Sequence, residues 1–290
     1  MDFLTGQSLL EVCQEQALPI SEIMRQRELK YSALNAEQIN GKLKTVLRIM
    51  KDAAHMPLLA PQKSMGGLIG GEAKKVHEHM QSHANVTGNI LSKAIAFSVA
   101  VLEVNASMGL IVAAPTAGSS GVVPGVLLAL QEEKQLADEE IHIGLLNASA
   151  IGYLFMHNAS VSGAEAGCQA EVGSASAMAA SAVVEIMGGT PEMCLQAASI
   201  AISNLLGMVC DPIAGLVEAP CQGRNAVGVA NALTCAELAL SGVTNPIPFD
   251  EMVTAMYRVG TALPVELRET AMGGAAATPT GCKLGCNNCS

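Results

Sequence analysis

The sequence has little charge and few aromatic side chains. Only 14% of its 290 residues are charged and 2% are aromatic, and tryptophan is absent. Because the net charge is −10 and few rings could stack on bases, the chain is not expected to bind nucleic acid. Half of the residues are hydrophobic, which excludes a disordered chain.

Charge is missing entirely from three long runs, at residues 104–131, 141–164 and 193–210. By length alone, each run could span a membrane. However, Pro115 and Pro124 interrupt the first run, and no cluster of Lys or Arg flanks the runs as a topology signal. We therefore expect buried helices and no membrane association. The start of the chain has no signal-like segment, so we expect a cytoplasmic protein.

Alanine and glycine are abundant, with 44 and 28 residues. Alanine is the best helix former, and both residues let helices approach closely. Two helix starts are clear: Asn35 is followed by Gln38, and Thr190 precedes Pro191. A further helix is expected from a cap at Asp138. No sustained alternation of apolar and polar residues predicts strands. The predicted fold class is all-α, with many helices and few or no strands.

The distribution of charge suggests how the chain is organised. Of its 42 charged residues, 14 lie in the first 56 positions. We predict an N-terminal helical prefix at residues 1–56, packed on a main helical domain at residues 57–272. Within the main domain, helices are expected to start near Glu72 and to cover residues 225–240. Residues 273–290, rich in Gly, Ala, Thr, Asn and Cys, are predicted to be an extended tail.

Three of the nine cysteines lie beside turn or polar residues, at Cys168, Cys210 and Cys221. A thiolate on a loop or at a helix end is accessible, and nearby N–H groups lower its pKa. In a reducing compartment, such thiols indicate metal binding or catalysis rather than disulfides. Their long spacing forms no local motif, so a shared metal site and separate inert thiols both remain open.

The tail contains Cys282, Cys286 and Cys289. This spacing is shared by iron–sulfur enzymes that generate radicals from S-adenosylmethionine. In those enzymes the motif precedes a barrel that binds the rest of the cofactor, whereas only one residue follows it here. Accessory or exposed thiols are therefore the favoured interpretation.

Two Gly- and Ser-rich turns, at residues 64–71 and 115–121, precede predicted helices. Their free N–H groups could bind a carboxylate, or the turns could simply join helices. Lys63 beside the first turn could form a Schiff base with pyridoxal phosphate, although the enzymes that use this cofactor usually contain a sheet. His157 ends a charge-free helix and could be either a core or a functional histidine.

Together, these stretches resemble the iron–sulfur L-serine dehydratases. The matching motifs are SMGG at 64–67, GGEA at 70–73, PTAGSSG at 115–121, SGAEAGCQAEVG at 162–173, CDP at 210–212, and PC with RN at 220–225. The chain is similar in particular to the α subunit of the two-subunit bacterial form, over roughly residues 55–282. The resemblance implies a helical catalytic domain, a [4Fe–4S] cluster, no pyridoxal phosphate and L-serine as substrate. It also implies a separate β subunit and a higher oligomer.

The resemblance places the cluster ligands on Cys168, Cys210 and Cys221, which leaves one iron open. The substrate carboxylate is expected to be bound by residues of the two turns and by one arginine: Ser64, Gly66, Gly67, Thr116, Gly118, Ser119, Ser120 and Arg224. The favoured base for the Cα proton is His157, because a histidine can be tuned near neutral pH. Glu165, Glu171 and a residue of the β subunit are alternatives.

Some implications of the resemblance remain open. The family's C-terminal cysteine, which can occupy the open iron when substrate is absent, falls on Cys282. The chain continues beyond that position, so binding of iron by a tail thiol is a hypothesis. A related helical family removes sulfide from cysteine, which makes an iron–sulfur L-cysteine desulfidase one alternative function. A non-catalytic helical scaffold is the other.

Overall fold

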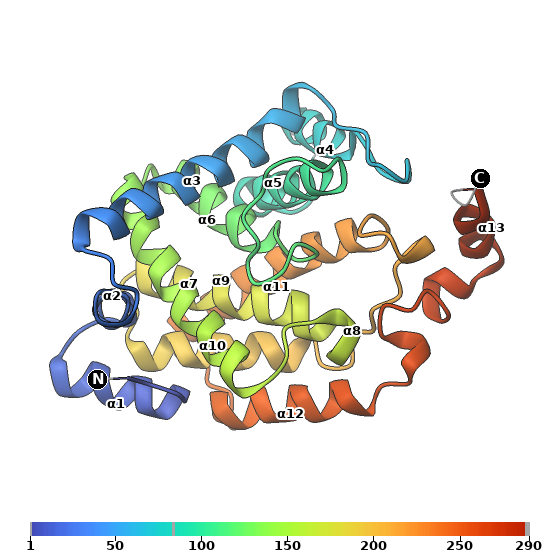
Figure 1. The fold of residues 1–290 in the computed structure, drawn as a ribbon. Helices are drawn as coiled ribbons and strands as arrows, with labels where there is room; N and C mark the ends of the chain where they lie inside the picture. The colour runs from blue at the N-terminus through green and yellow to red at the C-terminus, as the bar shows by residue number, and fades with distance from the viewer. Residues whose placement is uncertain (1, 83–84, 288–290) are drawn as a thin grey trace.

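The structure is a computed structural model that describes residues 2–82 and 85–287. This part of the chain is helical and contains no sheet, which confirms the predicted fold class. Figure 1 shows the arrangement, with the first helix and the last at opposite sides of the molecule. The α-helices are α1 (Gly6–Gln16), α2 (Ile20–Tyr31), α3 (Ala36–Leu59), α4 (Glu72–Gln81), α5 (Gly88–Ala106), α6 (Val122–Lys134), α7 (Asp138–Asn158), α8 (Gly163–Ala166), α9 (Ser174–Ile186), α10 (Pro191–Asn204), α11 (Cys221–Leu240), α12 (Phe249–Ala262) and α13 (Pro279–Asn287). A π-helical turn, η1 (Gln169–Gly173), precedes α9, and the 3-10 turns are η2 (Ile213–Gly215), η3 (Val265–Leu267) and η4 (Gly274–Ala277).

Helix α9 forms the centre of the core. It packs against α6, α7, α10 and α11, and all of its residues from 174 to 184 are buried. These residues are mostly Ala and Ser, so neighbouring helices can approach closely. The α5–α6 contact shows the same principle, because a Cβ at Gly125 would lie 2.9 Å from the carbonyl oxygen of Ala94. The abundance of small residues therefore serves dense helix packing.

The charge-free runs form much of this core. Most residues of α6, α7 and α10 in these runs are buried. By length and composition, α5 is apolar enough to cross a membrane, but 61% of its apolar 18-residue stretch is buried in the fold. It packs against α3, α4, α6 and α11, which accounts for its apolar surface.

The predicted helix starts are largely confirmed. Asn35 caps α3 and its side chain exchanges hydrogen bonds with Gln38, while Thr190 caps α10. Helix α4 begins at Glu72 as predicted. The cap at Asp138 is wrong, because Asp138 is the first residue inside α7 and its carboxylate binds Lys51 instead.

Three other boundaries differ from the predictions. Helix α11 begins at Cys221 rather than at residue 225. The tail predicted to be extended contains η4 and α13, because α13 packs against η2 and η4. Helix α3 continues to Leu59, so the predicted boundary after residue 56 falls inside a helix. The division into prefix, main domain and tail stays a prediction, and Cys289 lies outside the described residues.

Candidate active site

The structure brings together the three predicted ligands, Cys168, Cys210 and Cys221. Each is buried, with 2%, 3% and 7% of its surface exposed. Burial raises the pKa of the Cys168 and Cys221 thiols to about 12 and raises that of Cys210 as well. After burial, the negative charge of Cys168 is the next cause that raises the pKa of both other thiols. Hydrogen bonds join the segments that carry them, since Gln169 N donates to Met208 O at 3.0 Å and Arg224 donates to Val209 O at 2.7 Å.

Local backbone structure places each cysteine. Cys168 directly precedes η1, and Gly167 before it has φ of +76°, a conformation that favours glycine. Cys210 pairs with residues far along the chain: its N–H donates to Leu267 O at 2.8 Å, and its carbonyl accepts from Glu269 N at 2.6 Å. Cys221 begins α11. The site thus depends on contacts between distant parts of the sequence.

Arg224 lies one helical turn after Cys221 and is already engaged by protein groups. Its Nη1 donates to Val209 O at 2.7 Å, and its Nη2 donates to Asp211 Oδ1 at 2.6 Å. The positive charge of the guanidinium also acts to lower the pKa of the Cys168 thiol, against the effect of burial. In this structure, Arg224 therefore joins two of the cysteine-bearing segments.

Glu171 is a carboxylate among the thiols. It accepts a hydrogen bond from Thr116 Oγ1 on Oε1 at 2.8 Å. A Cβ at Gly163 would lie 2.7 Å from Glu171 Oε2 and 2.8 Å from Cys210 Sγ, so both groups pack closely against this glycine. Burial raises the pKa of Glu171; the bond from Thr116 opposes that rise and the charge of Glu269 adds to it.

The second Gly/Ser turn is held from α11 by Asn225. Its Nδ2 donates to Gly118 O at 2.8 Å and to Cys221 O at 2.9 Å. Its Oδ1 accepts from Gly121 N at 3.1 Å. One amide side chain thus fixes the middle and the end of the turn relative to the third cysteine.

The hydroxyl groups of this turn differ in their contacts. Those of Thr116 and Ser119 lie 3.0 Å apart. Ser119 and Ser120 are both fully buried. Within the residues that the structure describes, the Oγ of Ser120 has no hydrogen-bond partner. The turn therefore retains one hydroxyl that no protein atom satisfies.

The first Gly/Ser turn contains a protein carboxylate. Glu218, which is 2% exposed, accepts from Ser64 Oγ at 2.6 Å. It also accepts from the N–H groups of Gly66 at 2.7 Å and Leu68 at 2.8 Å. Gly66 is required here, since a Cβ would lie 2.8 Å from Glu218 Oε1. Gly67, with φ of +73°, closes the turn by donating its N–H to Ser64 Oγ. Two groups that were expected to bind the substrate carboxylate, the Ser64 hydroxyl and the Gly66 N–H, therefore already donate to Glu218.

The other candidates are exposed. His157 lies in the last turn of α7 and stacks on Tyr153, with ring centroids 6.0 Å apart. Glu165 is exposed on α8, and Lys63 is exposed before the first turn. Cys282 is exposed on α13, and its Sγ donates to a backbone carbonyl of η4. Glu171 is the candidate base whose charge acts on all three thiols.

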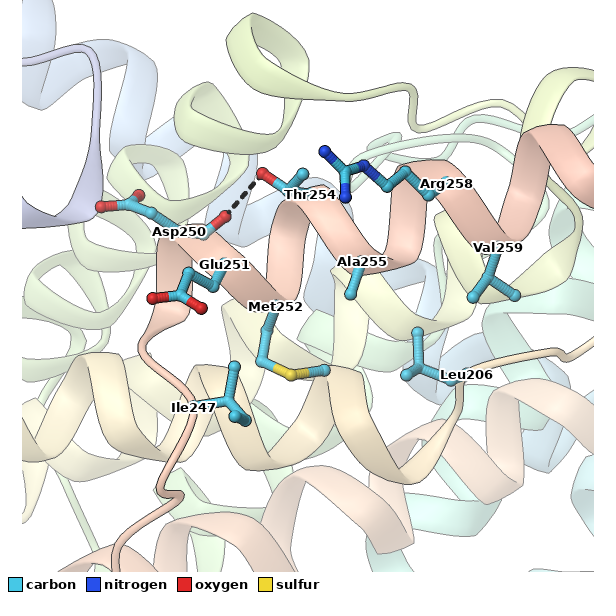
Figure 2. Close-up of a pocket in the computed structure, with 9 residues that line it drawn as sticks. All are labelled: Leu206, Ile247, Asp250, Glu251, Met252, Thr254, Ala255, Arg258 and Val259. Carbon is cyan, nitrogen blue, oxygen red and sulfur yellow. Dashed lines mark hydrogen bonds between the residues drawn. The ribbon is translucent and has the colours of Figure 1, made fainter.

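A pocket of about 790 Å³ lies elsewhere, along α12 and the end of α10. Figure 2 shows that its lining is largely apolar and contains no cysteine. The carboxylate of Asp250 at one end already accepts hydrogen bonds from Gly6 N at 2.6 Å and Gln7 N at 2.9 Å. The predicted cysteine ligands and the two glycine turns therefore lie outside this pocket.

The three thiols are ligands of the type that holds iron–sulfur clusters. No group of three His, Cys, Asp or Glu in the described part of the chain is arranged to hold a metal ion. Metal binding requires thiolates, and positively charged iron would offset the burial and mutual repulsion that keep these thiols protonated. The donor set therefore fits an iron–sulfur cluster.

Sequence reasoning did not single out Glu218 or Asn225. Glu218 is the single charged residue within residues 212–220, just before Cys221. A lone acid in an apolar segment near a candidate ligand is a usable signal, because a buried charge must find partners. Asn225 belongs to a matched motif, but its amide contacts depend on the tertiary fold.

The fold and site define a helical protein with three buried cysteines on segments that hydrogen bonds connect. A family model described as serine dehydratase alpha chain matches residues 15–276. The "Probable L-serine dehydratase, alpha chain" of Bacillus subtilis is 46% identical over 282 residues, which cover 97% of this chain and 94% of that protein. The "L-serine dehydratase, alpha chain" of Peptoniphilus asaccharolyticus is 46% identical over 280 residues, covering 97% and 96%. The chain belongs to the serine dehydratase alpha chain family, which confirms the resemblance seen in its motifs.

A longer relative completes the comparison. The "L-serine dehydratase" of Streptomyces coelicolor is 36% identical over 277 residues. The match covers 94% of this chain but 60% of that protein. This chain therefore corresponds to one part of the longer relative.

Proposed function

We propose that this chain is the α subunit of an L-serine dehydratase, a lyase that converts L-serine to pyruvate and ammonia. The proposal is supported by the burial of Cys168, Cys210 and Cys221 on segments that hydrogen bonds connect, in a chain whose relatives are named L-serine dehydratases. Those names do not favour the L-cysteine desulfidase or the non-catalytic scaffold.

The three cysteines would hold a [4Fe–4S] cluster. Three protein thiolates leave one iron without a protein ligand. When bound, the cluster supplies a Lewis acid that acts on the substrate hydroxyl, and pyridoxal phosphate is not required. The chain's part is to keep the three sulfurs buried and to neutralise part of their charge with Arg224.

Glu171 is the residue we assign to removal of the Cα proton. Its Oε1 is fixed by Thr116, while Oε2 packs against Gly163 beside Cys210. A carboxylate that one hydroxyl holds in place beside the thiols is positioned to act as a general base. Loss of the Cα proton and the β-hydroxyl gives water and an aminoacrylate. The aminoacrylate rearranges to an imine, which water hydrolyses to pyruvate and ammonia. His157 stays a prediction as the alternative base.

The active enzyme would also contain a β subunit. The relatives that match nearly the whole of this chain are named alpha chains, which supports a second kind of subunit. We propose a cytoplasmic αβ assembly that forms a higher oligomer.

Replacement of one cluster ligand tests the proposal. Purified without oxygen together with the β subunit, the wild-type chain should contain iron and sulfide, absorb broadly in the visible range and release pyruvate from L-serine. Cys221→Ser should lose the visible absorbance and about a hundredfold in pyruvate release. Cys235→Ser is the matched control, since Cys235 is buried in the same helix and contacts Asn204 instead.

Two results would reject the proposal. A colourless wild-type protein that contains no iron would exclude the cluster. A Schiff-base absorption band that disappears in Lys63→Ala would instead indicate a pyridoxal phosphate enzyme.

A further inference from the structure

Glu218 is a buried carboxylate with no assigned role. Its charge is met by one hydroxyl, from Ser64, and by the backbone N–H groups of Gly66 and Leu68. Both carboxylate oxygens are used, since Oε1 accepts from Gly66 and Oε2 accepts from Ser64 and Leu68. Hydrogen bonds to an ionised carboxylate are the strong ones, and a buried carboxylate without them is very costly.

The position of Glu218 connects this turn to the cysteine site. Glu218 lies three residues before Cys221, and its carbonyl accepts from Gln222 N in the first turn of α11 at 2.9 Å. On the other side of Cys221, Asn225 binds the second turn. The segment that carries Cys221 is therefore attached to one glycine turn on each side.

A second carboxylate cannot readily share the first turn. A substrate carboxylate bound to the N–H groups of Gly66 and Leu68 would have to displace Glu218. The displaced group would then be buried beside another negative charge without its donors. Ser64 is itself only 5% exposed, so its hydroxyl offers little access to a second carboxylate.

We propose that Glu218 is a positioning residue: its carboxylate fixes the turn at residues 64–68 and, through this contact, holds the segment that carries Cys221. The turn then serves the cysteine site and does not bind the substrate carboxylate. This inference rests on the proposed function wherever it concerns the cluster.

The variant Glu218→Gln tests this role. A glutamine has one carbonyl oxygen and one NH2 group, so at least one donor of the turn would face another donor. In the holoenzyme we expect kcat to fall about tenfold while KM for L-serine stays within about twofold. The visible absorbance of the cluster should disappear about tenfold faster in air. Glu237→Gln, an exposed change on α11 with the same loss of charge, is the control.

The variant Ser64→Ala provides a milder test. It removes one of the three donors to Glu218 and should lower kcat and increase air sensitivity, as Glu218→Gln does. Because both variants break the bond between Ser64 and Glu218, their effects should not add in the double variant. If Glu218→Gln fails to fold, Ser64→Ala decides the question by the same measurements.

Limited proteolysis tests the contact without the cluster. Lys63 is exposed beside the turn, so release of the turn should speed tryptic cleavage after Lys63 about tenfold in metal-free Glu218→Gln. An unchanged cleavage rate would overturn the inference, as would a rise in KM with unchanged kcat in Glu218→Gln or Ser64→Ala. If the wild-type chain binds no cluster, the proposed function fails, while cleavage after Lys63 still tests the contact.

Discussion

Two carboxylates near the cysteines differ in what their oxygens contact. Glu218 accepts three hydrogen bonds and uses both oxygens. Glu171 accepts from Thr116 through Oε1, and its Oε2 packs against Gly163 beside Cys210. A carboxylate held by one hydroxyl keeps more capacity to accept a proton than one bound by three donors. This difference is why we assign proton transfer to Glu171 and positioning to Glu218.

Glu171→Gln should separate proton removal from cluster binding. A glutamine keeps the shape and can still accept from Thr116, but it cannot take a proton from Cα. We expect exchange of the Cα hydrogen of L-serine with solvent to fall by about 10²–10⁴-fold, while iron content is unchanged. Glu165→Gln, an exposed change on α8, is the control. Normal exchange in Glu171→Gln together with lost exchange in His157→Gln would assign the base to His157.

The chemical character of the site can be read from the sequence, but its contacts cannot. The three cysteines and both turns stand out because unusual residues cluster there. Glu218 and its partner Ser64 are 154 positions apart, and no local pattern joins them. A favourable anion-binding turn therefore indicates that a carboxylate will be bound, without showing whether it comes from a ligand or from the chain.

Helix starts were predictable because their signals are local. Asn35 and Thr190 accept hydrogen bonds from backbone groups three residues later, and neither contact requires the rest of the fold. The π-helical turn η1 and helix α13 were not predicted. Helix α13 packs against η2 and η4, and η1 packs against α8, α9 and α12, so tertiary contacts decide both.

A titratable pair links α3 to α6. Nε2 of His55 lies 2.8 Å from Oε1 of Glu132. The hydrogen bond raises the pKa of His55 above 6.5 and lowers that of Glu132 below 4.5. Protonated His55 therefore contributes to the free energy of unfolding fully below its ordinary pKa, and this contribution is lost as pH rises through the raised pKa. Ionised Glu132 contributes fully above its ordinary pKa, and its contribution is lost as pH falls through the lowered pKa.

His55→Gln should consequently destabilise the protein within a limited range of pH. The thermal midpoint should fall at about pH 5.5, where both groups are charged, and change little at about pH 9, where the wild-type histidine is neutral. Because both side chains are partly exposed, the effect should shrink at high salt. His79→Gln on the exposed face of α4 is the control. Equal losses at both pH values would show that packing, not charge, is responsible.

Over the whole molecule, stability depends on close contact between helices lined by small residues. Gly125→Ala would place a Cβ 2.9 Å from the carbonyl oxygen of Ala94 on α5, and backbone cannot easily move. We expect this change to lower the free energy of unfolding by about 1–3 kcal/mol. Gly41→Ala changes an exposed position of α3, where a Cβ meets no atom within 4 Å. This change should raise the free energy of unfolding by about 0.5–1 kcal/mol. Urea denaturation measures both, and similar effects of the two substitutions would contradict this account.

The pairing of Cys210 with residues 267–269 has a consequence for the order of events in biosynthesis. Two backbone hydrogen bonds that set the position of Cys210 join it to Leu267 and Glu269, 57 and 59 positions later in the chain. A ribosome must therefore translate the codons of these residues before Cys210 can take its final position. A messenger truncated ahead of these codons should yield a product in which Cys210 is not held in place.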